Sequence, residues 1–575
     1  MKFKQIALTA GIAVLAMGSI AHADTFTGSG TGHGGDVPVT VVYEDGQITD
    51  IQVGENSETD GIGTIAIEQL PGTIVEAQSL DVDAVTGATE TSSAILAAVE
   101  AALTDNGINI ASFHGEKKEE ALAEGEAEET DVVIVGAGLS GLMAAYELKE
   151  NYPDVDYIII EKLGMVGGSI PGTGGCMAAV SSKYHEADGT QSTPSDFVDL
   201  FKFTSNAEVN EQLVLNVYEE SDVLLNRLLD AGAPFEEATG QTSKYNDKVF
   251  YLQTELKEGA KVRGASFGEF LSDYVEKDPI NIRMNTKATG LIVEEGQVKG
   301  IKAEDKEKKY EIHASAVLLA TGGFGSSKEM MEKYLPIHAD DFMSTNGGAT
   351  GDGINMVEEY FDVAVIGDGS MGSIVAPDGT PLIASNFMVN AAGERFIGEQ
   401  EPKYVLQRAV AEQEGKTAFL IVDSTYEDKA TLEDKISKGY VKEYATLEEL
   451  AQDNGIDADA LAATVADYTE KAAAGEEIEA LEFALAAEAA TPLDTAPYYV
   501  EKVTVRTFGT LPGLEINENC QIVTTDGEAV PGLYASGELV AGNAFTRQYP
   551  GIGIGISFAG NSGRYAIKQI AENIG

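Results

Sequence analysis

A glycine-rich loop between an apolar run and a helical stretch has the spacing of a dinucleotide-binding turn. The run 131–135 (DVVIV) predicts a buried parallel strand, and Gly136, Gly138 and Gly141 follow it directly. Glu161 lies 20 residues beyond Gly141, at the end of the next apolar run. These glycines permit a tight turn and the close approach of a pyrophosphate to a helix N-terminus, while the carboxylate accepts hydrogen bonds from a ribose. The pattern therefore predicts a dinucleotide site.

A second candidate phosphate site lies at residues 83–89 (DAVTGAT), just before a helical stretch at about 92–103. A helix N-terminus carries unpaired N–H groups and a partial positive charge, and both favour a phosphate. The alternative is an ordinary N-cap made by the threonines. Ahead of this motif, alternating apolar and polar residues at 37–43 and 48–53 predict a β-hairpin, so the sequence indicates a small α+β unit.

Composition and the first residues restrict the partners and the compartment. The 575 residues hold 38 Lys+Arg against 94 Asp+Glu, a formal charge of −56 that argues against binding nucleic acid or an anionic membrane surface. Lys2 and Lys4, an apolar run at 6–20 and Ala21-His22-Ala23 predict a signal peptide over 1–23, so an exported, periplasmic or otherwise extracytoplasmic protein is expected, soluble after cleavage. A retained anchor helix is the alternative, but the run is short for a span, and no transmembrane segment is predicted.

The two cysteines, Cys176 and Cys520, form no Cys-x-x-Cys-His motif. The sequence therefore predicts neither covalent haem nor a metal site.

Further glycine-rich segments resemble those of a known protein family. Segments 167–169, 172–175, 320–323 and 534–538, together with the loop at Gly136, resemble the flavoprotein family of fumarate reductases, flavocytochrome c and ketosteroid dehydrogenases. The resemblance covers roughly residues 130–575 and implies non-covalent FAD in a Rossmann-type α/β fold. It implies that FAD is held by Gly136, Ala137, Gly138, Ser140, Gly141, Glu161, Lys162, Gly168, Ser169, Gly174, Gly175, Ala288, Thr321, Gly322, Asp352, Glu538 and Ile556. A second complete dinucleotide loop, as NADH would need, is absent from the sequence.

The motif at 83–89 resembles that of exported FMN-binding domains. In that family the last residue, Thr89 here, is esterified to the phosphate of FMN by a flavin transferase. The resemblance thus implies covalent FMN on Thr89 and a maturation partner.

The stretch 389–399 (VNAAGERFIGE) resembles the Val-Asn-x-x-Gly-x-Arg-Phe-x-x-Glu motif of fumarate reductases. In that family the arginine at the position of Arg395 donates the proton to the substrate. An arginine is seldom deprotonated, so this role needs a carboxylate relay, and Glu399 or Asp378 could supply it. The alternative is a salt bridge between Arg395 and Glu399 within a capping domain.

Two segments depart from fumarate reductase. Residues 506–510 (RTFGT) stand where that family has His-Thr-Met-Gly-Gly, so Arg506 replaces a substrate-binding histidine. Arg547 precedes the sequence from Tyr549 to Gly553 (YPGIG), which looks more like ketosteroid dehydrogenases. Arg395, Arg506 and Arg547 suit a clamp for a carboxylate, although structural salt bridges are the alternative for the last two.

The sequence therefore predicts an exported reductase of the C=C bond in an α,β-unsaturated carboxylate such as fumarate, urocanate, an acrylate or a cinnamate. Electrons would pass from a membrane quinol dehydrogenase, a cytochrome or a flavoprotein through FMN to FAD. The alternatives are a ketosteroid dehydrogenase-like enzyme that depends on Tyr549, and a non-enzymatic flavin electron carrier. The expected parts are a signal peptide (1–23), an α+β FMN-binding domain (24–112), a linker (113–129), a Rossmann-type α/β FAD-binding domain (130–364 and 498–575) and an inserted α+β capping domain (365–497).

Overall fold

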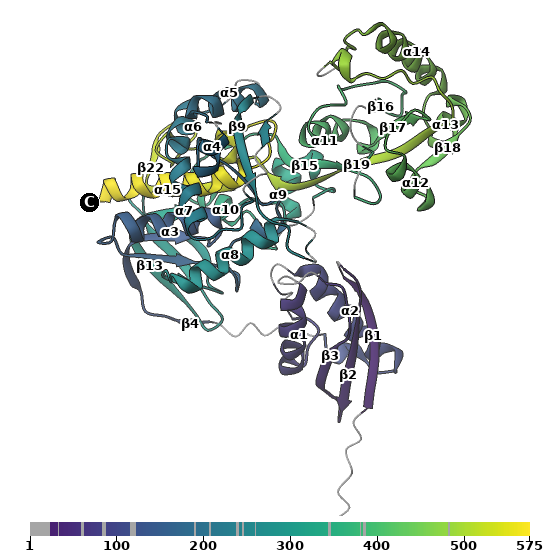
Figure 1. The fold of residues 1–575 in the computed structure, drawn as a ribbon. Helices are drawn as coiled ribbons and strands as arrows, with labels where there is room; N and C mark the ends of the chain where they lie inside the picture. The colour runs from purple at the N-terminus through teal and green to yellow at the C-terminus, as the bar shows by residue number, and fades with distance from the viewer. Residues whose placement is uncertain are drawn as a thin grey trace, which may run out of the picture. The chain divides into compact units, whose positions relative to one another are not determined.

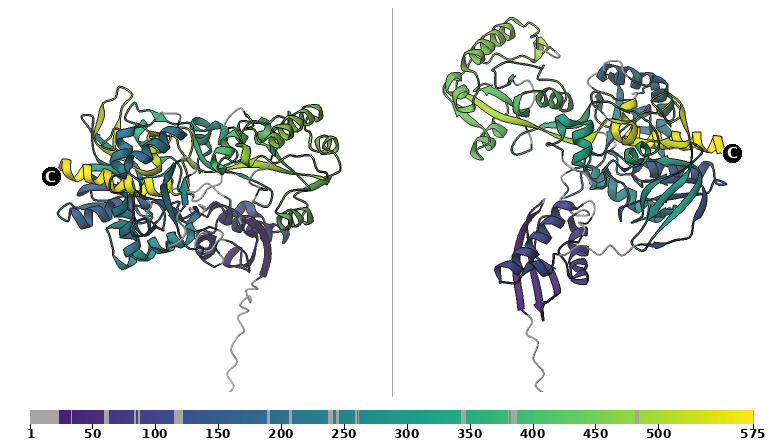
Figure 2. Two further views of the ribbon diagram at one scale, coloured as in Figure 1. Left: turned by 45° about the horizontal axis from the view of Figure 1, so that its top comes forward. Right: turned by 180° about the vertical axis from the view of Figure 1, so that it is seen from behind.

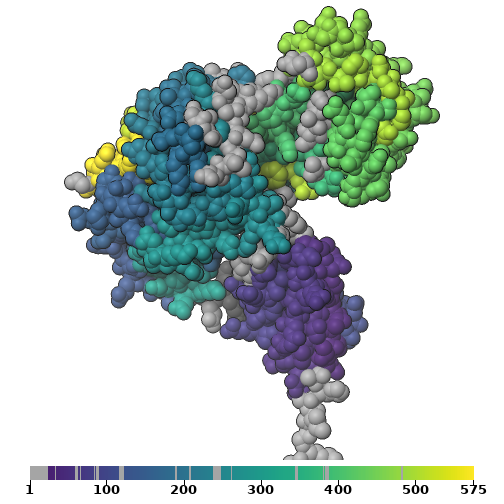
Figure 3. All heavy atoms as spheres, in the orientation of Figure 1, coloured from purple at the N-terminus to yellow at the C-terminus, as the bar shows by residue number. Residues whose placement is uncertain are grey.

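The computed structural model describes residues 24–32, 34–58, 63–82, 85, 88–114, 122–188, 191–205, 209–236, 241–243, 246–258, 260, 262–342, 347–379, 381–382, 387–480 and 484–574; all others are grey in Figure 3. The predicted signal peptide lies outside these ranges, as do 115–121 of the predicted linker. The chain divides into two compact units, Met1–Glu120 and Ala121–Gly575.

The first unit is a three-stranded antiparallel sheet covered by two helices (Figure 1). The predicted hairpin is confirmed as strands β2 (Gly35–Glu44) and β3 (Gln47–Val53). Strand β1 (Asp24–Gly32) adds to its edge, and helices α1 (Gly63–Ala77) and α2 (Thr89–Asp105) complete the unit. A Cβ on Gly28 of β1 would lie 2.0 Å from the carbonyl oxygen of Ala98, so glycine lets α2 pack directly on the strand. A short turn η1 (Ile110–Ser112) follows α2.

The second unit is built on a nine-stranded sheet whose parallel part is the predicted α/β fold. Strand β13 (Lys308–Leu319) pairs in parallel with β5 (Glu128–Val135) and β22 (Ala529–Ala535), and β5 pairs in parallel with β6 (Tyr157–Ile160). The remaining strands of this sheet are β4 (Ala123–Glu124), β10 (Ile282–Arg283), β11 (Lys287–Glu294), β12 (Gln297–Glu304) and β21 (Gln521–Val523). Because the central strands are buried on both faces, they read as continuous apolar runs rather than as alternating patterns.

Helices and a small sheet surround this large sheet. Helix α15 (Ile554–Ile574) packs along α3 (Leu139–Asn151), as Figures 1 and 2 show. The small sheet contains β7 (Cys176–Ala178), β8 (Gln241–Ser243) and β9 (Asn246–Gln253). The other elements are η2 (Ile170–Gly172), α4 (Lys183–Asp188), α5 (Pro194–Thr204), α6 (Glu211–Tyr218), α7 (Ser221–Asp230), α8 (Gly264–Lys277), α9 (Lys328–Tyr334), η3 (Pro336–His338), α10 (Asp352–Glu358) and η6 (Gly537–Asn543).

The predicted capping domain (365–497) has α+β structure, and strand β19, which follows it, completes its sheet. Strand β19 (Tyr498–Thr510) pairs with β17 (Ala418–Asp423) in its first half and with β15 (Ser370–Val375) in its second half. The other elements here are β14 (Val365–Ile366), β16 (Phe387–Val389), α11 (Lys403–Ala411), η4 (Glu414–Lys416), α12 (Lys429–Ser437), β18 (Lys442–Tyr444), α13 (Leu447–Asn454), α14 (Ala458–Ala474) and η5 (Ala487–Ala489). Beyond β19, strand β20 (Gly513–Leu514) pairs with β14.

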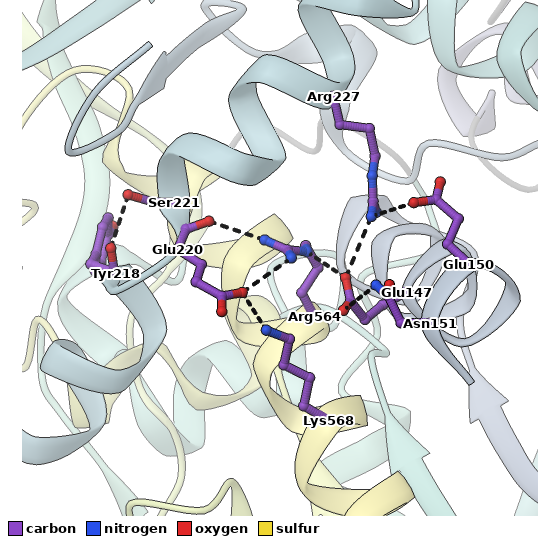
Figure 4. Close-up of polar contacts among 9 residues, drawn as sticks. All are labelled: Glu147, Glu150, Asn151, Tyr218, Glu220, Ser221, Arg227, Arg564 and Lys568. Atoms are coloured by element: carbon purple, nitrogen blue, oxygen red, sulfur yellow. Dashed lines mark hydrogen bonds and ion pairs between the residues drawn. The ribbon is translucent and has the colours of Figure 1, made fainter.

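A buried ionic network fastens α15 to its neighbours (Figure 4). The Nε of Arg564 donates to Glu147 of α3 at 2.8 Å, and its Nη1 donates to the backbone carbonyl of Glu220 at 3.0 Å. Lys568 also binds the Glu220 carboxylate, and Arg227 of α7 lies 3.5 Å from Glu147. Only 1% of the Glu147 side chain and 5% of the Arg564 side chain are exposed, so this network joins three helices in the interior.

Among the described residues, none of the helices combines the length and the apolar character that crossing a bilayer requires.

Candidate active site

The strand, turn and helix predicted at Gly136 are present. Gly136 has φ +108°, and a Cβ there would lie 2.5 Å from the Ala320 carbonyl oxygen, so both the turn and the adjacent strand end require glycine. Helix α3 begins at Leu139 after Gly138, and Gly138 gives the helix no side-chain cap. The first N–H groups of α3 are therefore left for a ligand, as a pyrophosphate site requires.

Glu161 holds this turn in place from the end of β6. Its carboxylate accepts hydrogen bonds from the backbone N–H groups of Ala137 and Leu163, both at 2.8 Å. Burial raises the pKa of Glu161 above its ordinary value, although the two backbone hydrogen bonds act in the opposite direction. The predicted ribose-binding carboxylate thus lies directly beside the glycine-rich loop.

Other residues predicted to hold FAD come together around this loop. The Ser140 hydroxyl lies 2.7 Å from that of Ser536, and Glu538 accepts hydrogen bonds from both the backbone N–H and the hydroxyl of Thr510, at 2.8 and 3.0 Å. Lys162 binds Asp352 at 2.7 Å, and a backbone bridge joins Gly138 to Gly167. The remaining predicted residues lie as follows: Gly168 and Ser169 in the turn before η2, Gly174 and Gly175 before β7, Ala288 on β11, Thr321 and Gly322 after β13, and Ile556 on α15.

The chemistry of this region fits FAD. The Thr321 hydroxyl oxygen is buried and has no hydrogen-bond partner among the described residues, as expected for a group that a ligand satisfies. A Cβ on Gly174 or Gly322 would meet nothing within 4 Å, so space is left beside both glycines. The uncapped α3 N-terminus, the Glu161 carboxylate and the orphaned Thr321 hydroxyl would serve the pyrophosphate, a ribose and a further polar group of the cofactor.

Arg395 lies inside the capping region, paired with Glu399. Its Nε and Nη2 donate to the two carboxylate oxygens, both at 2.7 Å, and the guanidinium lies over the ring of Tyr468. Only 5% of the Arg395 side chain and 2% of the Glu399 side chain are exposed. Of the two carboxylates considered as a relay, Glu399 is thus the one in contact, because Asp378 binds Lys435 instead at 2.8 Å. This bidentate pair is also the predicted salt bridge, and the proton-donating role of Arg395 stays a prediction.

The three arginines predicted as a carboxylate clamp occupy different surroundings. Arg506 lies on the exposed face of β19, between the buried Val505 and Thr507. Arg547 instead lines a small cleft. The side chains around this cleft come from both the FAD-binding part and the capping region: Ile337, His338, Asp368, Ser370, Tyr404, Gln407, Arg408, Glu412, Arg547 and Gln548. Of the three arginines, Arg547 is the one that lines the cleft.

Helix α11 supplies cleft residues that the sequence reading missed. Tyr404, Gln407 and Arg408 have the spacing i, i+3 and i+4, so one face of the helix lines the cleft. Nη1 of Arg408 donates to the Arg547 carbonyl oxygen at 2.9 Å, and its Nε lies 3.2 Å from Glu412. The helical spacing was visible in the sequence, but nothing local indicated which face of α11 meets Arg547.

Tyr549 lies behind this cleft. Its hydroxyl accepts a hydrogen bond from the Gly555 N–H at 2.8 Å, and its ring lies edge-on to that of Tyr404, with 5.6 Å between centroids. Burial raises the pKa of Tyr549 well above its ordinary value, so the phenol keeps its proton. A neutral phenol of this kind can donate a hydrogen bond to a carbonyl or carboxylate oxygen.

Of the predicted FMN motif at 83–89, residues 83, 84, 86 and 87 lie outside the described ranges. Helix α2 begins at Thr89, three residues earlier than predicted, so the motif runs into the helix itself. The N–H of Val85 donates to the Ser92 hydroxyl at 2.9 Å, and the Thr91 hydroxyl donates to Glu58. Val85 is thus anchored to the first turn of α2, and Thr91 in that turn is anchored to Glu58, next to the helix N-terminus that a phosphate would use.

Comparisons with known proteins identify both flavin-binding domains. The family model described as "FAD binding domain" matches residues 131–556, and the one described as "FMN-binding domain" matches residues 32–104. A urocanate reductase of Eggerthella lenta is 30% identical over 90% of this chain and 87% of its own length. An NADH:acrylate oxidoreductase of Vibrio harveyi is 28% identical over 91% of this chain, which spans only 58% of that relative.

Among solved structures, the open conformation of a flavocytochrome c3 fumarate reductase matches with a TM-score of 0.57 and 28% identity, over 78% of this chain and 79% of the other. The fold, the cofactor-binding domains and these relatives lead to one conclusion. The chain belongs to the FAD-dependent reductases of the fumarate reductase type and carries an FMN-binding domain ahead of its FAD-binding domain.

Proposed function

We propose that this flavoprotein reduces the C=C bond of an α,β-unsaturated carboxylate of the fumarate, urocanate, acrylate or cinnamate type. The observation that carries the proposal is the cleft lined by Arg408 and Arg547. Arginine is suited to a carboxylate because it donates paired hydrogen bonds in the plane that a carboxylate offers, and the proposal assigns this contact to Arg547. Arg408 supports Arg547 through the Arg547 carbonyl and is itself paired with Asp368 and Glu412 at the same cleft. Relatives named for urocanate, acrylate and fumarate support the same class of substrate.

Reduced FAD would supply a hydride to the β-carbon of such a substrate. The work of this chain is to hold the carboxylate and to stabilise the negative charge that develops toward it as the β-carbon is attacked. Arg547 performs that work in the proposal, and Arg408 supports it. Arg395 remains the predicted proton donor for the α-carbon, with Glu399 as the carboxylate neighbour that the role requires.

We also propose that the protein is exported and that electrons reach FAD through FMN esterified to Thr89. The signal-like residues 1–23 and the FMN-binding domain support this route. A flavin transferase would attach the FMN, and a membrane quinol dehydrogenase, a cytochrome or another flavoprotein would reduce it. The negative formal charge of −56 favours a donor with a basic docking surface.

A ketone substrate is the second candidate, and the tyrosine pair supports it. Tyr549 and Tyr404 are both neutral by burial, and Tyr549 lies in the segment that resembles ketosteroid dehydrogenases. A phenol can polarise the oxygen of an enone without any positive charge nearby. Turnover of such a substrate would depend on Tyr549, and its KM would not change when Arg547 is replaced.

The variants Arg547→Gln and Arg506→Gln together test the carboxylate proposal, and the comparison is between their KM values. Arg547→Gln is expected to raise KM for an unsaturated carboxylate by about 10-fold or more, because a charged hydrogen bond contributes roughly 1.5–3 kcal/mol. Arg506→Gln is expected to leave KM unchanged, since Arg506 lies on the exposed face of β19. Steady-state kinetics with reduced methyl viologen measure both, with Tyr549→Phe as the third variant. A normal KM in Arg547→Gln together with an inactive Tyr549→Phe would instead favour the ketone.

The substrate class itself is tested with the FAD- and FMN-loaded protein reduced under anaerobic conditions. Fumarate, urocanate, acrylate, cinnamate and a 3-ketosteroid enone are added separately, and reoxidation of the flavin is followed by absorbance. Reoxidation by at least one acid and none by the enone is expected. Reoxidation by the enone alone would overturn the proposal.

A further inference from the structure

Glu58, in the segment after β3, joins the turn between β1 and β2 to helix α2. One oxygen of its carboxylate accepts a hydrogen bond from the N–H of Gly34 in that turn, at 2.7 Å. The other oxygen accepts a hydrogen bond from the hydroxyl of Thr91, in the first turn of α2. Neither the sequence motifs nor the proposed electron route uses Glu58, although it contacts the helix that begins at the predicted attachment residue.

The surroundings of Glu58 fix this contact. A Cβ on Gly63, the first residue of α1, would lie 2.7 Å from the Glu58 Cβ and 2.9 Å from the Thr91 hydroxyl oxygen, so a larger residue there would force the contact apart. The Asn56 side chain accepts a hydrogen bond from the Glu58 N–H at 3.1 Å and donates to the Gly54 carbonyl at 2.9 Å. Only 2% of Thr91 is exposed. The contact is therefore set before any flavin arrives.

Helix α2 needs such an anchor because its N-terminus has no local cap. The N-cap residue is Ala88, whose side chain cannot accept a hydrogen bond from the first turn. An uncapped end leaves N–H groups unpaired, and a carboxylate beside it is favoured by the helix dipole. The hydrogen bond from Val85 to Ser92 anchors the chain ahead of the helix. Thr89, the first residue of α2, thus lies between two anchored positions of the chain.

We infer that Glu58, through Thr91, positions the first turn of α2 so that Thr89 can be esterified to FMN. The inference rests on the proposed attachment of FMN to Thr89. In that step the Thr89 oxygen would form a bond to a phosphorus of a flavin dinucleotide, the pyrophosphate bond to the nucleoside monophosphate would break, and the hydroxyl proton would be lost. The attacking oxygen has to be held in line with the bond that breaks, so an anchored turn reacts faster than a frayed one. Glu58 and Thr91 are positioning residues, since they act through Thr89.

A matched pair of variants at Thr91 tests this role. Thr91→Val keeps the shape of the side chain and loses the hydroxyl, whereas Thr91→Ser keeps the hydroxyl. The full chain, produced without a flavin transferase, is incubated with a purified transferase and FAD, and fluorescence in a denaturing gel gives the rate of covalent attachment. Thr91→Val is expected to slow attachment about 10-fold or more, because a hydrogen bond to a charged group is lost. Thr91→Ser should react at nearly the wild-type rate.

Glu58→Gln tests the same contact from its other side. It should slow attachment by less than Thr91→Val does, because an amide oxygen can still accept a weaker hydrogen bond. The double variant should be no slower than Thr91→Val alone, since both changes remove one contact. Glu68→Gln, at an exposed glutamate of α1, is the matched control and should react at the wild-type rate.

Hydrogen exchange of the flavin-free protein separates positioning from a general loss of structure. In Thr91→Val, amide exchange is expected to rise in the first turn of α2 and to stay at the wild-type level in β2 and β3. Faster exchange throughout the sheet would overturn the positioning role, because the contact would then support the whole unit.

The attachment rates also distinguish failure of the inference from failure of the proposed function. Attachment to Thr91→Val at the wild-type rate, or to Thr91→Ser as slowly as to Thr91→Val, would overturn the inference. The ester at Thr89 would still stand if Thr89→Val carried no covalent flavin. Covalent flavin in Thr89→Val, or none in the wild-type protein, would remove the proposed attachment and the inference together.

Discussion

Replacement of Thr89 by valine is expected to abolish the flavin that stays with the chain after denaturation. Valine has nearly the shape of threonine but lacks the hydroxyl through which the FMN phosphate would be esterified. The anchors on either side of Thr89, Val85 to Ser92 and Thr91 to Glu58, do not involve its hydroxyl and should survive. The measurement is flavin fluorescence in a denaturing gel, after co-expression with a flavin transferase. Thr73→Val, at an exposed threonine of α1, is the control and should keep the fluorescent band.

The same variant separates the electron route from the catalytic site. FAD is held by the second unit, so the Thr89→Val protein should still reduce its substrate when reduced methyl viologen, a small donor, is supplied. Fluorescence that persists in the variant would place the ester elsewhere. Loss of methyl viologen turnover would mean that the FMN-binding domain supports the FAD-binding domain in some way other than electron delivery.

Replacement of Arg564 by methionine is expected to destabilise the FAD-binding part by about 3–5 kcal/mol. The variant leaves Glu147, almost fully buried on α3, without the guanidinium that binds it at 2.8 Å. Glu147 would keep the Asn151 amide at 2.7 Å and the more distant Arg227 at 3.5 Å, but it would lose its closest positive charge. A buried carboxylate that loses such a partner is costly because low-dielectric surroundings do not replace its water. Unfolding in urea, followed by the release of FAD fluorescence, measures the effect.

Two matched variants show whether the buried pair of Glu147 and Arg564 accounts for this loss of unfolding free energy. Lys568→Met removes a partner of the half-exposed Glu220 and should cost less than about 1 kcal/mol. The double variant Glu147→Met/Arg564→Met removes both charges of the buried pair and should be more stable than Arg564→Met alone. A double variant as unstable as the single one would contradict the assignment, because it would indicate lost packing rather than a stranded charge.

The elements that could be predicted from sequence are those specified by neighbouring residues. The run 131–135, its glycines and the following helix are local patterns, and so is the contact between Arg395 and Glu399, which are four residues apart. Strand β1 was not predicted, because glycine at every second position of 28–32 conceals the apolar alternation while allowing α2 to pack closely.

The cleft could be predicted only in part. Arg547 was identified from its motif, but Arg408, Gln407 and His338 meet it through contacts that span many residues of sequence. The placement of Arg506 also depended on long-range information. The side that a strand residue faces is set by its pairing register, and β15 and β17 fix that register from distant parts of the chain.

Strand β19 restricts how homologous sequences can differ in length. Its residues from Glu501 to Thr507 alternate between an inward and an outward face, and its last residue, Thr510, contacts Glu538. A deletion or insertion of one residue within 501–507 would invert the facing of the neighbouring side chains in this segment, burying Arg506 or exposing Thr507. Length variation among relatives should therefore accumulate in the loops before and after this strand, while the strand itself diverges only by substitution.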